Sequence, residues 1–156
     1  SRMVKVIQEN GGVVDKFIGD AVMAVFSEYF GTSEPHRSAV KAAVAMRQEL
    51  AGLNLEFAGE GKQTIDIGTG IHAGPVVAGN IGSVDRKNFT VIGNTVDIAA
   101  RLQAETKILH HPILISAEVY QKCGPLDGVS FIDTEEIQVK GKQRKIHVYR
   151  VECEDI

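Results

Sequence analysis

The sequence is poor in cysteine and contains no long hydrophobic run. Its two cysteines, Cys123 and Cys153, lack the spacing of metal ligands, and so few cysteines in a domain of this size favour a reducing compartment over a disulfide framework. No apolar stretch is long enough to span a membrane, and no signal peptide is evident. We therefore expect a cytoplasmic location, either as a separate protein or as the cytosolic portion of a larger one, with no membrane contact by this segment.

An excess of basic residues is also missing. The formal net charge of −3 provides no electropositive field, so nucleic acid is not an expected partner. The content of 44% hydrophobic and 24% charged residues is that of a globular protein. At 156 residues the chain can bury one substantial core, and we expect a single domain over 1–156.

Apolar periodicity and turn residues predict alternating helices and strands. In chain order they are the end of a helix (1–10), a hairpin (13–26), a helix (Pro35 to about Leu53), strands (64–72, 76–80 and 89–92), a helix (95–107), a strand (113–115), a helix (117–122) and a hairpin (130–150). Helices interleaved with hairpins predict the α+β class, with helices covering a sheet.

Two β-prone apolar runs meet at Gly19-Asp20, which is a hairpin signal. The turn would leave the Asp20 carboxylate at the tip, with Lys16 four residues earlier on the incoming strand. A carboxylate at such a corner can bind Mg²⁺ through one oxygen while phosphate and water complete the octahedron. Taken alone, the pattern fits an ordinary polar turn better than a metal site.

A second stretch, Phe89–Arg101, changes that interpretation. Together with Lys16-Phe17-Ile18-Gly19-Asp20 it resembles the two signatures of the catalytic domain of class III nucleotidyl cyclases, which make cyclic AMP or cyclic GMP. The Gly-rich segment Ile67–Gly82 and the later Val139–Lys142 are also similar to that family, and the resemblance spans residues 3–150. It implies a ferredoxin-like βαββαβ core, the nucleotidyl cyclase fold, with a mainly antiparallel sheet covered by helices.

The implied reaction is that of a lyase that converts ATP to 3′,5′-cyclic AMP and pyrophosphate for intracellular signalling. The ribose 3′-hydroxyl attacks the α-phosphate with the help of two Mg²⁺ or Mn²⁺ ions. In the family two aspartates hold both ions, and Asp20 matches the second. The first belongs to an upstream strand, so we expect this segment to lack the first strand and the start of the first helix, and to be inactive alone.

The resemblance also implies which residues read the purine. The family pairs Lys with Asp or Thr in adenylyl cyclases, and Glu with Cys or another small residue in guanylyl cyclases. Lys16 and Thr90 occupy these positions, and the Thr version is similar to the class IIIb subgroup of cyanobacterial and bicarbonate-responsive enzymes. Adenine N1 accepts a hydrogen bond, so an ammonium donor suits ATP. A guanylyl cyclase is the alternative.

The helix after Thr90 carries the predicted catalytic residues. Arg101 matches the family's transition-state arginine, whose guanidinium contacts phosphate oxygens. The family usually has Asp at position 94 and Asn at position 97, whereas this sequence has Asn94 and Asp97. Asn94 can cap the helix, but Asp97 has no amide hydrogen to donate near the ribose, and we expect it to lower turnover. Lys140 or Lys142 is implied to reach the triphosphate.

Active sites in the family form between two domains packed head to tail. One domain supplies the metal aspartates, and the other supplies the purine-reading pair and the Asn/Arg pair. We therefore expect a homodimer with two composite ATP sites, and regulatory or sensor domains in the parent chain. The competing interpretation is a degenerate cyclase-like domain that only dimerises or binds nucleotide.

Two further motifs are expected to be structural. The segment Gly68–Gly82 lacks the Gly-Lys-Ser/Thr ending of a phosphate-binding loop, so close backbone packing at a dimer seam is the preferred interpretation. His72 is expected to be a packed strand residue rather than a metal ligand.

Overall fold

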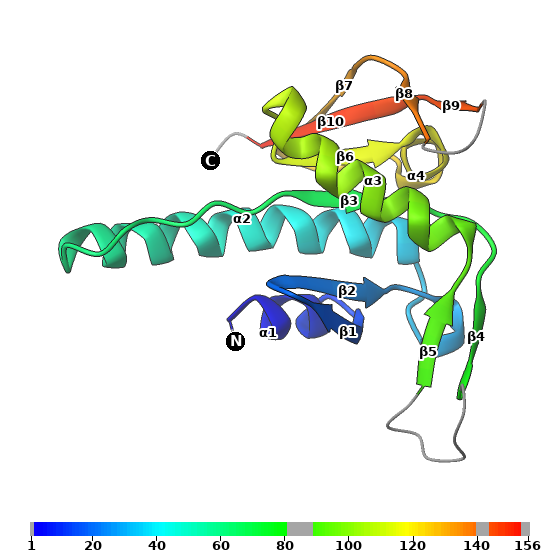
Figure 1. Ribbon diagram of the computed structural model, residues 1–156, viewed down its shortest axis with the longest axis horizontal. Coiled ribbons are helices and arrows are strands. Elements are labelled where there is room, and N and C mark those ends of the chain that lie inside the picture. Colours follow the sequence, from blue (N-terminus) through cyan, green and yellow to red (C-terminus); the bar gives the residue numbers. More distant parts are fainter. Residues whose placement is uncertain (1, 81–88, 140–143, 154–156) are drawn as a thin grey trace.

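The computed structural model describes residues 2–80, 89–139 and 144–153 (Figure 1). The elements, in chain order, are α1 (Arg2–Glu9), β1 (Val13–Ile18), β2 (Ala21–Val25), the 3₁₀ helix η1 (Glu28–Phe30), α2 (Pro35–Gly59), β3 (Thr69–Ile71), β4 (Val77–Asn80), β5 (Phe89–Ile92), α3 (Asn94–Leu109), β6 (Ile113–Ser116), α4 (Ala117–Cys123), β7 (Val129–Asp133), β8 (Ile137–Gln138), β9 (Lys145–Ile146) and β10 (Val148–Cys153).

The main sheet has four strands in the order β3-β6-β10-β7. Strand β3 pairs with β6 in parallel, and β10 is antiparallel to both β6 and β7. All four residues of β6 are buried, as expected for a strand with helices on both faces. The mixed helix and strand content confirms the α+β class.

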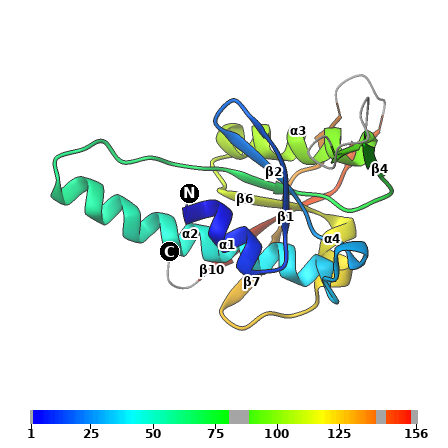
Figure 2. The same ribbon diagram turned by 90° about the horizontal axis from the view of Figure 1, so that it is seen from below.

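Strand β6 separates two hydrophobic clusters. On one face, Ile113 and Ile115 pack with residues of α2 and α4, including Val40 and Val119. On the other face, Leu114 packs with α3 and with the short β8–β9 ladder. Because successive strand residues point to opposite faces, the sheet forms the middle of three layers, with α2 and α4 on one side and α3 on the other (Figure 2).

The hairpin β1–β2 forms a two-stranded sheet of its own, next to α1, which in turn packs on α2 (Figures 1 and 2). Its turn is Gly19-Asp20, where Gly19 has a φ of 60° and Ile18 pairs with Ala21. A positive φ at the first turn residue alone is the pattern of a type II′ turn, which matches the twist of the strands. The register shifts between Val14 and Lys16, so Asp15 lies in a β-bulge.

Strands β4 and β5 form a second antiparallel ladder, which extends away from the main sheet as an arm (Figure 1). Strand β1 contacts β5, so the hairpin and the arm lie against each other. Helix α3 begins immediately after β5 and returns across the main sheet. The chain thus connects the hairpin surface to the helix that carries the predicted catalytic residues.

The predicted strand over 64–72 is wrong for its first half, because only Thr69–Ile71 is a strand. Helix α2 instead continues to Gly59, beyond the expected end near Leu53. The chain that follows runs back along α2 (Figure 2), and α2 side chains take up its backbone bonds. Asn54 exchanges two hydrogen bonds with the backbone of Ile65, at 2.7 and 2.9 Å. No strand within residues 2–80, 89–139 and 144–153 pairs with residues 64–68.

Within the described part of the chain, no helix is both long enough and apolar enough to cross a membrane.

Candidate active site

Lys16 and Asp20 lie on the β1–β2 hairpin, as predicted from the sequence. Asp20 is exposed at the tip of β1–β2, and Lys16 is half-buried on β1. The Lys16 ammonium lies 3.5 Å from the carboxylate of Asp15, whose side chain is 2% exposed. A buried carboxylate therefore orients the Lys16 side chain at the edge of the hairpin.

Strand β1 of Lys16 contacts strand β5, which contains Thr90. The backbone of Thr90 pairs with Gly79 on β4; its side chain is not among those described. The fold thus brings the strands of the two predicted purine-reading positions together within one chain, although 74 positions of sequence separate residues 16 and 90. Which atoms of the base they contact remains a prediction.

Helix α3 begins one residue earlier than it would if Asn94 were its N-cap. Gly93 is the N-cap, with a φ of 143°, and its carbonyl accepts from the backbone N–H groups of Val96 and Asp97 at 3.1 and 3.3 Å. This backbone conformation suits glycine alone, so Gly93 takes the cap position and Asn94 becomes the first helical residue. Asp97 is exposed in the first turn of α3, where the partial positive charge of the helix N-terminus stabilises an acidic side chain.

Arg101 forms an ion pair that the sequence motif did not predict. Its Nη2 lies 2.9 Å from Oε1 of Glu105, one turn further along α3. The Arg101 side chain is 37% exposed, whereas that of Glu105 is only 10% exposed. The i, i+4 spacing of Arg101 and Glu105, with the glutamate on the apolar stripe of the helix, could have predicted this ion pair. The family motif ends at Arg101, so it contains Asp97 but not Glu105.

The Gly-rich strand packs against α3 of the same chain. A Cβ atom at Gly70 would come within 2.3 Å of the backbone N of Gln103, and one at Gly74 within 2.7 Å of Thr95 Oγ1. At Gly68 a Cβ would collide with the side chain of Thr106. Close backbone packing is therefore confirmed as a role of these glycines, with the partner being α3. A place for this segment at a dimer seam stays a prediction.

His72 lies directly after β3 and is half-buried. Its Nδ1 is 2.7 Å from Oγ of Ser116, which is fully buried at the end of β6. Burial lowers the pKa of the His72 imidazole below its ordinary value, an effect that Arg144 reinforces and Glu118 opposes. The residue is packed, as expected, and its hydrogen bond connects β3 to the start of α4.

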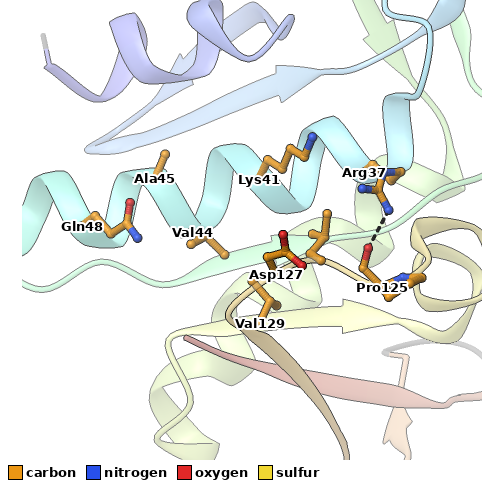
Figure 3. A pocket seen from close by; sticks show the side chains of 9 residues that line it. Arg37, Lys41, Val44, Ala45, Gln48, Pro125, Asp127 and Val129 are labelled. Atoms are coloured by element: carbon orange, nitrogen blue, oxygen red, sulfur yellow. Dashed lines mark hydrogen bonds between the residues drawn. The ribbon is translucent and has the colours of Figure 1, made fainter. Parts of the chain in front are cut away.

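A cavity of about 350 Å³ lies elsewhere, between α2 and the segment after α4 (Figure 3). Arg37 closes one end by donating to the carbonyl oxygens of Cys123 and Pro125 at 2.9 and 2.8 Å. Lys41 and Asp127 also line the cavity (Figure 3). None of the predicted site residues whose side chains the structure describes lines this cavity, which is therefore separate from Lys16, Asp20, Asp97 and Arg101.

Asp20 is the predicted metal ligand that the structure describes. No group of three or more His, Cys, Asp or Glu side chains arranged for a metal occurs among the described residues. Asp20 is exposed, and no ion pair restrains its carboxylate within the described ranges. It fits a divalent ion as one oxygen ligand, with the other ligands supplied from elsewhere. Lys140 and Lys142, the predicted triphosphate contacts, lie outside the described residues.

Comparison with known proteins identifies the family of this chain. Residues 1–152 match the family model of the adenylate and guanylate cyclase catalytic domain. The chain belongs to this family. An adenylate cyclase of Anabaena cylindrica is 37% identical over 97% of the chain, which spans only 30% of that relative's length.

Solved structures place the fold in the same family. The adenylyl cyclase CyaB from P. aeruginosa has a TM-score of 0.82 and 31% identity, over 96% of this chain and 76% of that one. The guanylyl cyclase Cya2 has a TM-score of 0.82 and 29% identity, over 96% of this chain and 74% of that one. The class III nucleotidyl cyclase fold predicted from the motifs is thereby confirmed. Both purine specificities occur among its neighbours.

Proposed function

We propose that this chain is the catalytic domain of an adenylyl cyclase of the Thr-containing, class IIIb-like subgroup. It converts ATP to 3′,5′-cyclic AMP and pyrophosphate. The observation that carries the proposal is the contact between β1 and β5, which brings the strands of Lys16 and Thr90 together on one protomer. The 37% identity to an adenylate cyclase supports the same choice.

The purine-reading pair favours adenine for a chemical reason. A lysine ammonium donates to the N1 acceptor of adenine, and the threonine hydroxyl can accept from the exocyclic amine. Guanine carries a hydrogen on N1, so GTP would leave the ammonium facing another donor. A site built around one base edge discriminates strongly, because the wrong base leaves buried polar groups unpaired.

The reaction forms a bond between the ribose O3′ and the α-phosphorus and breaks the bond from that phosphorus to the bridging oxygen of pyrophosphate. The hydroxyl proton passes to solvent or to a nearby base. Arg101 provides a planar, always charged donor for the phosphate oxygens. Asp97 is four positions earlier on α3. In this proposal it would face the ribose and add negative charge there. A lysine from 140–142 would contact the triphosphate.

Asp20 would hold Mg²⁺ or Mn²⁺ through one carboxylate oxygen. When bound, the two ions expected in a complete site neutralise phosphate charge and activate the 3′-hydroxyl. The second carboxylate would come from a strand upstream of this segment, which would then lack the first strand and the start of the first helix of the domain. The full-length protein is therefore the species in which activity is expected.

The active form is a head-to-tail homodimer. Large apolar side chains are exposed at the hairpin tip, where Phe17 is 64% and Ile18 is 59% exposed, and on the β4–β5 arm, where Val77 is 66% and Ile92 is 45% exposed. Exposed apolar groups gathered in this way mark an interaction surface. Asp20 is next to Phe17 and Ile18 in the sequence, so a partner that covers the tip would receive this carboxylate.

The test is a product assay on the full-length protein with Mg²⁺ or Mn²⁺. We expect cyclic AMP from ATP at a rate at least about tenfold above cyclic GMP from GTP, and loss of both in Asp20→Asn. Preferential formation of cyclic GMP would make the protein a guanylyl cyclase. Nucleotide binding without any product would identify a non-catalytic member of the family, which Asp97 would help to explain.

A further inference from the structure

Glu105 occupies an unusual position on α3. It follows the spacing of Ile98, Leu102 and Leu109, the residues by which this helix packs on the core. Ile98 and Leu102 are 2% and 1% exposed, and Glu105 is 8% exposed. A carboxylate is rarely this buried unless a cation or several donors compensate its loss of hydration. The ion pair with Arg101 at 2.9 Å provides that compensation.

The pair does little for the helix itself. An acidic residue stabilises a helix best when it precedes its basic partner by four positions, and here the order is reversed. Apolar residues of similar volume in place of a buried ion pair often leave stability unchanged or raise it. A leucine would therefore satisfy the packing requirement at position 105 at least as well as the glutamate does.

The conformation of the Arg101 side chain indicates the effect of Glu105 on it. The Nε atom of Arg101 is buried and has no hydrogen-bond partner among the described residues. A side chain oriented freely into water would hydrate this group, and leaving it unbonded costs free energy. The attraction of Glu105 for Nη2 therefore determines the conformation. Only part of the guanidinium is engaged, and the half-exposed side chain retains further donors.

We propose that Glu105 is a positioning residue that holds the Arg101 guanidinium ready for the phosphates of the nucleotide. This rests on the proposed function, in which Arg101 contacts those phosphates. Fixing the side chain before binding reduces the conformational entropy lost on reaching the transition state. It also keeps Arg101 away from Asp97, its other i, i+4 carboxylate; within the described residues no ion pair joins those two.

The experiment compares Glu105→Leu, Glu105→Gln and Arg101→Ala in the full-length protein, with thermal unfolding and steady-state kinetics for ATP. We expect Glu105→Leu to unfold at the wild-type temperature or above it, yet to lower kcat at least about tenfold, with a smaller change in KM. Glu105→Gln retains an oxygen that can accept from Nη2 and should preserve more of kcat than the leucine. Glu49→Leu, which removes another arginine-paired helical glutamate, should keep the wild-type kcat.

The double variant separates the two proposals. If Glu105 acts through Arg101, Glu105→Leu has no further effect once Arg101 is alanine. An unchanged or higher kcat in a stably folded Glu105→Leu protein overturns the positioning role alone. The positioning role is also overturned if Glu105→Leu and Glu105→Gln both lose stability and lose activity in proportion, because that result indicates a purely structural role. Wild-type activity in Arg101→Ala instead contradicts the proposed function.

Discussion

Gly70 on β3 lies directly against the backbone of Gln103 on α3. A side chain at position 70 would bring its Cβ to 2.3 Å from the Gln103 nitrogen and 2.6 Å from the carbonyl oxygen of Ala99. Both are backbone atoms, so no side-chain movement can relieve the overlap. The absence of a Cβ at Gly70 thus sets how closely the helix of Asp97 and Arg101 approaches the sheet.

Gly70→Ala should therefore displace α3. We expect the free energy of unfolding to fall by at least about 2 kcal/mol, together with a loss of cyclase activity. Gly52→Ala is the matched control, because Gly52 lies within α2 with no atom within 4 Å of its Cβ position. It should raise stability by about 0.5–1 kcal/mol. Urea unfolding of both variants measures this, and wild-type stability of Gly70→Ala would refute the packing argument.

Asp97→Asn should raise turnover. It removes a negative charge from the first turn of α3 and restores an amide donor at the position where the family usually has one. Because Asp97 is exposed, solvent screens its charge, and we expect a gain in kcat of only about two- to tenfold. Asp127→Asn, an exposed aspartate on the separate α2 cavity, is the control. Unchanged or slower turnover in Asp97→Asn would show that the aspartate is not inhibitory.

Lys16→Glu should change the nucleotide preference. A carboxylate at this position accepts from the N1–H of guanine, whereas it would face the N1 acceptor of adenine. We expect ATP turnover to fall at least about tenfold while the ratio of GTP to ATP turnover rises. The readout is the formation of cyclic AMP and cyclic GMP by the same preparation. A ratio equal to that of the wild type would remove Lys16 from purine recognition.

His72 should make the fold less stable in mild acid. Burial lowers its pKa in the folded state, so between that pKa and the ordinary value of 6.5 the unfolded chain binds more protons. The contribution is fully present above pH 6.5 and is lost as the pH falls through the folded pKa. His36, whose pKa is also lowered by burial, acts in the same direction.

His72→Asn should therefore flatten the pH dependence of stability. The measurement is the free energy of unfolding in urea at neutral pH and at about pH 5. We expect a smaller loss on acidification in the variant than in the wild type, with the residual loss reflecting His36. Equal losses in the two proteins would contradict the assignment.

The local signals of the sequence were sufficient for much of the fold. Gly19-Asp20 predicts the β1–β2 turn, and Pro35 predicts the first residue of α2, because both depend on backbone geometry that few residues satisfy. The motif around Phe89–Arg101 predicts the strand and the helix that follows it. The family and its fold follow from these motifs, not from composition.

Features decided by distant contacts could not be predicted. The segment before Thr69 alternates like a strand, but Asn54 and Arg47 of α2 bind its backbone, and none of the described strands pairs with it. The Gly-rich segment packs on α3, and the sequence does not show that these two segments lie together. The Arg101–Glu105 ion pair depends on the burial of the Glu105 side chain, which the family motif does not predict. The roles of all the predicted site residues remain predictions: Lys16, Asp20, Thr90, Asp97, Arg101, Lys140 and Lys142.

The central claim is that Asp20 and Arg101 of one chain serve different active sites of a homodimer. Asp20→Asn and Arg101→Ala versions of the full-length protein should each be nearly inactive. Mixed in equal amounts and allowed to exchange subunits, they should recover about a quarter of wild-type cyclic AMP synthesis, since half of the dimers are mixed and one of their two sites is intact. If exchange is verified and the mixture stays as inactive as its components, the head-to-tail composite site is contradicted.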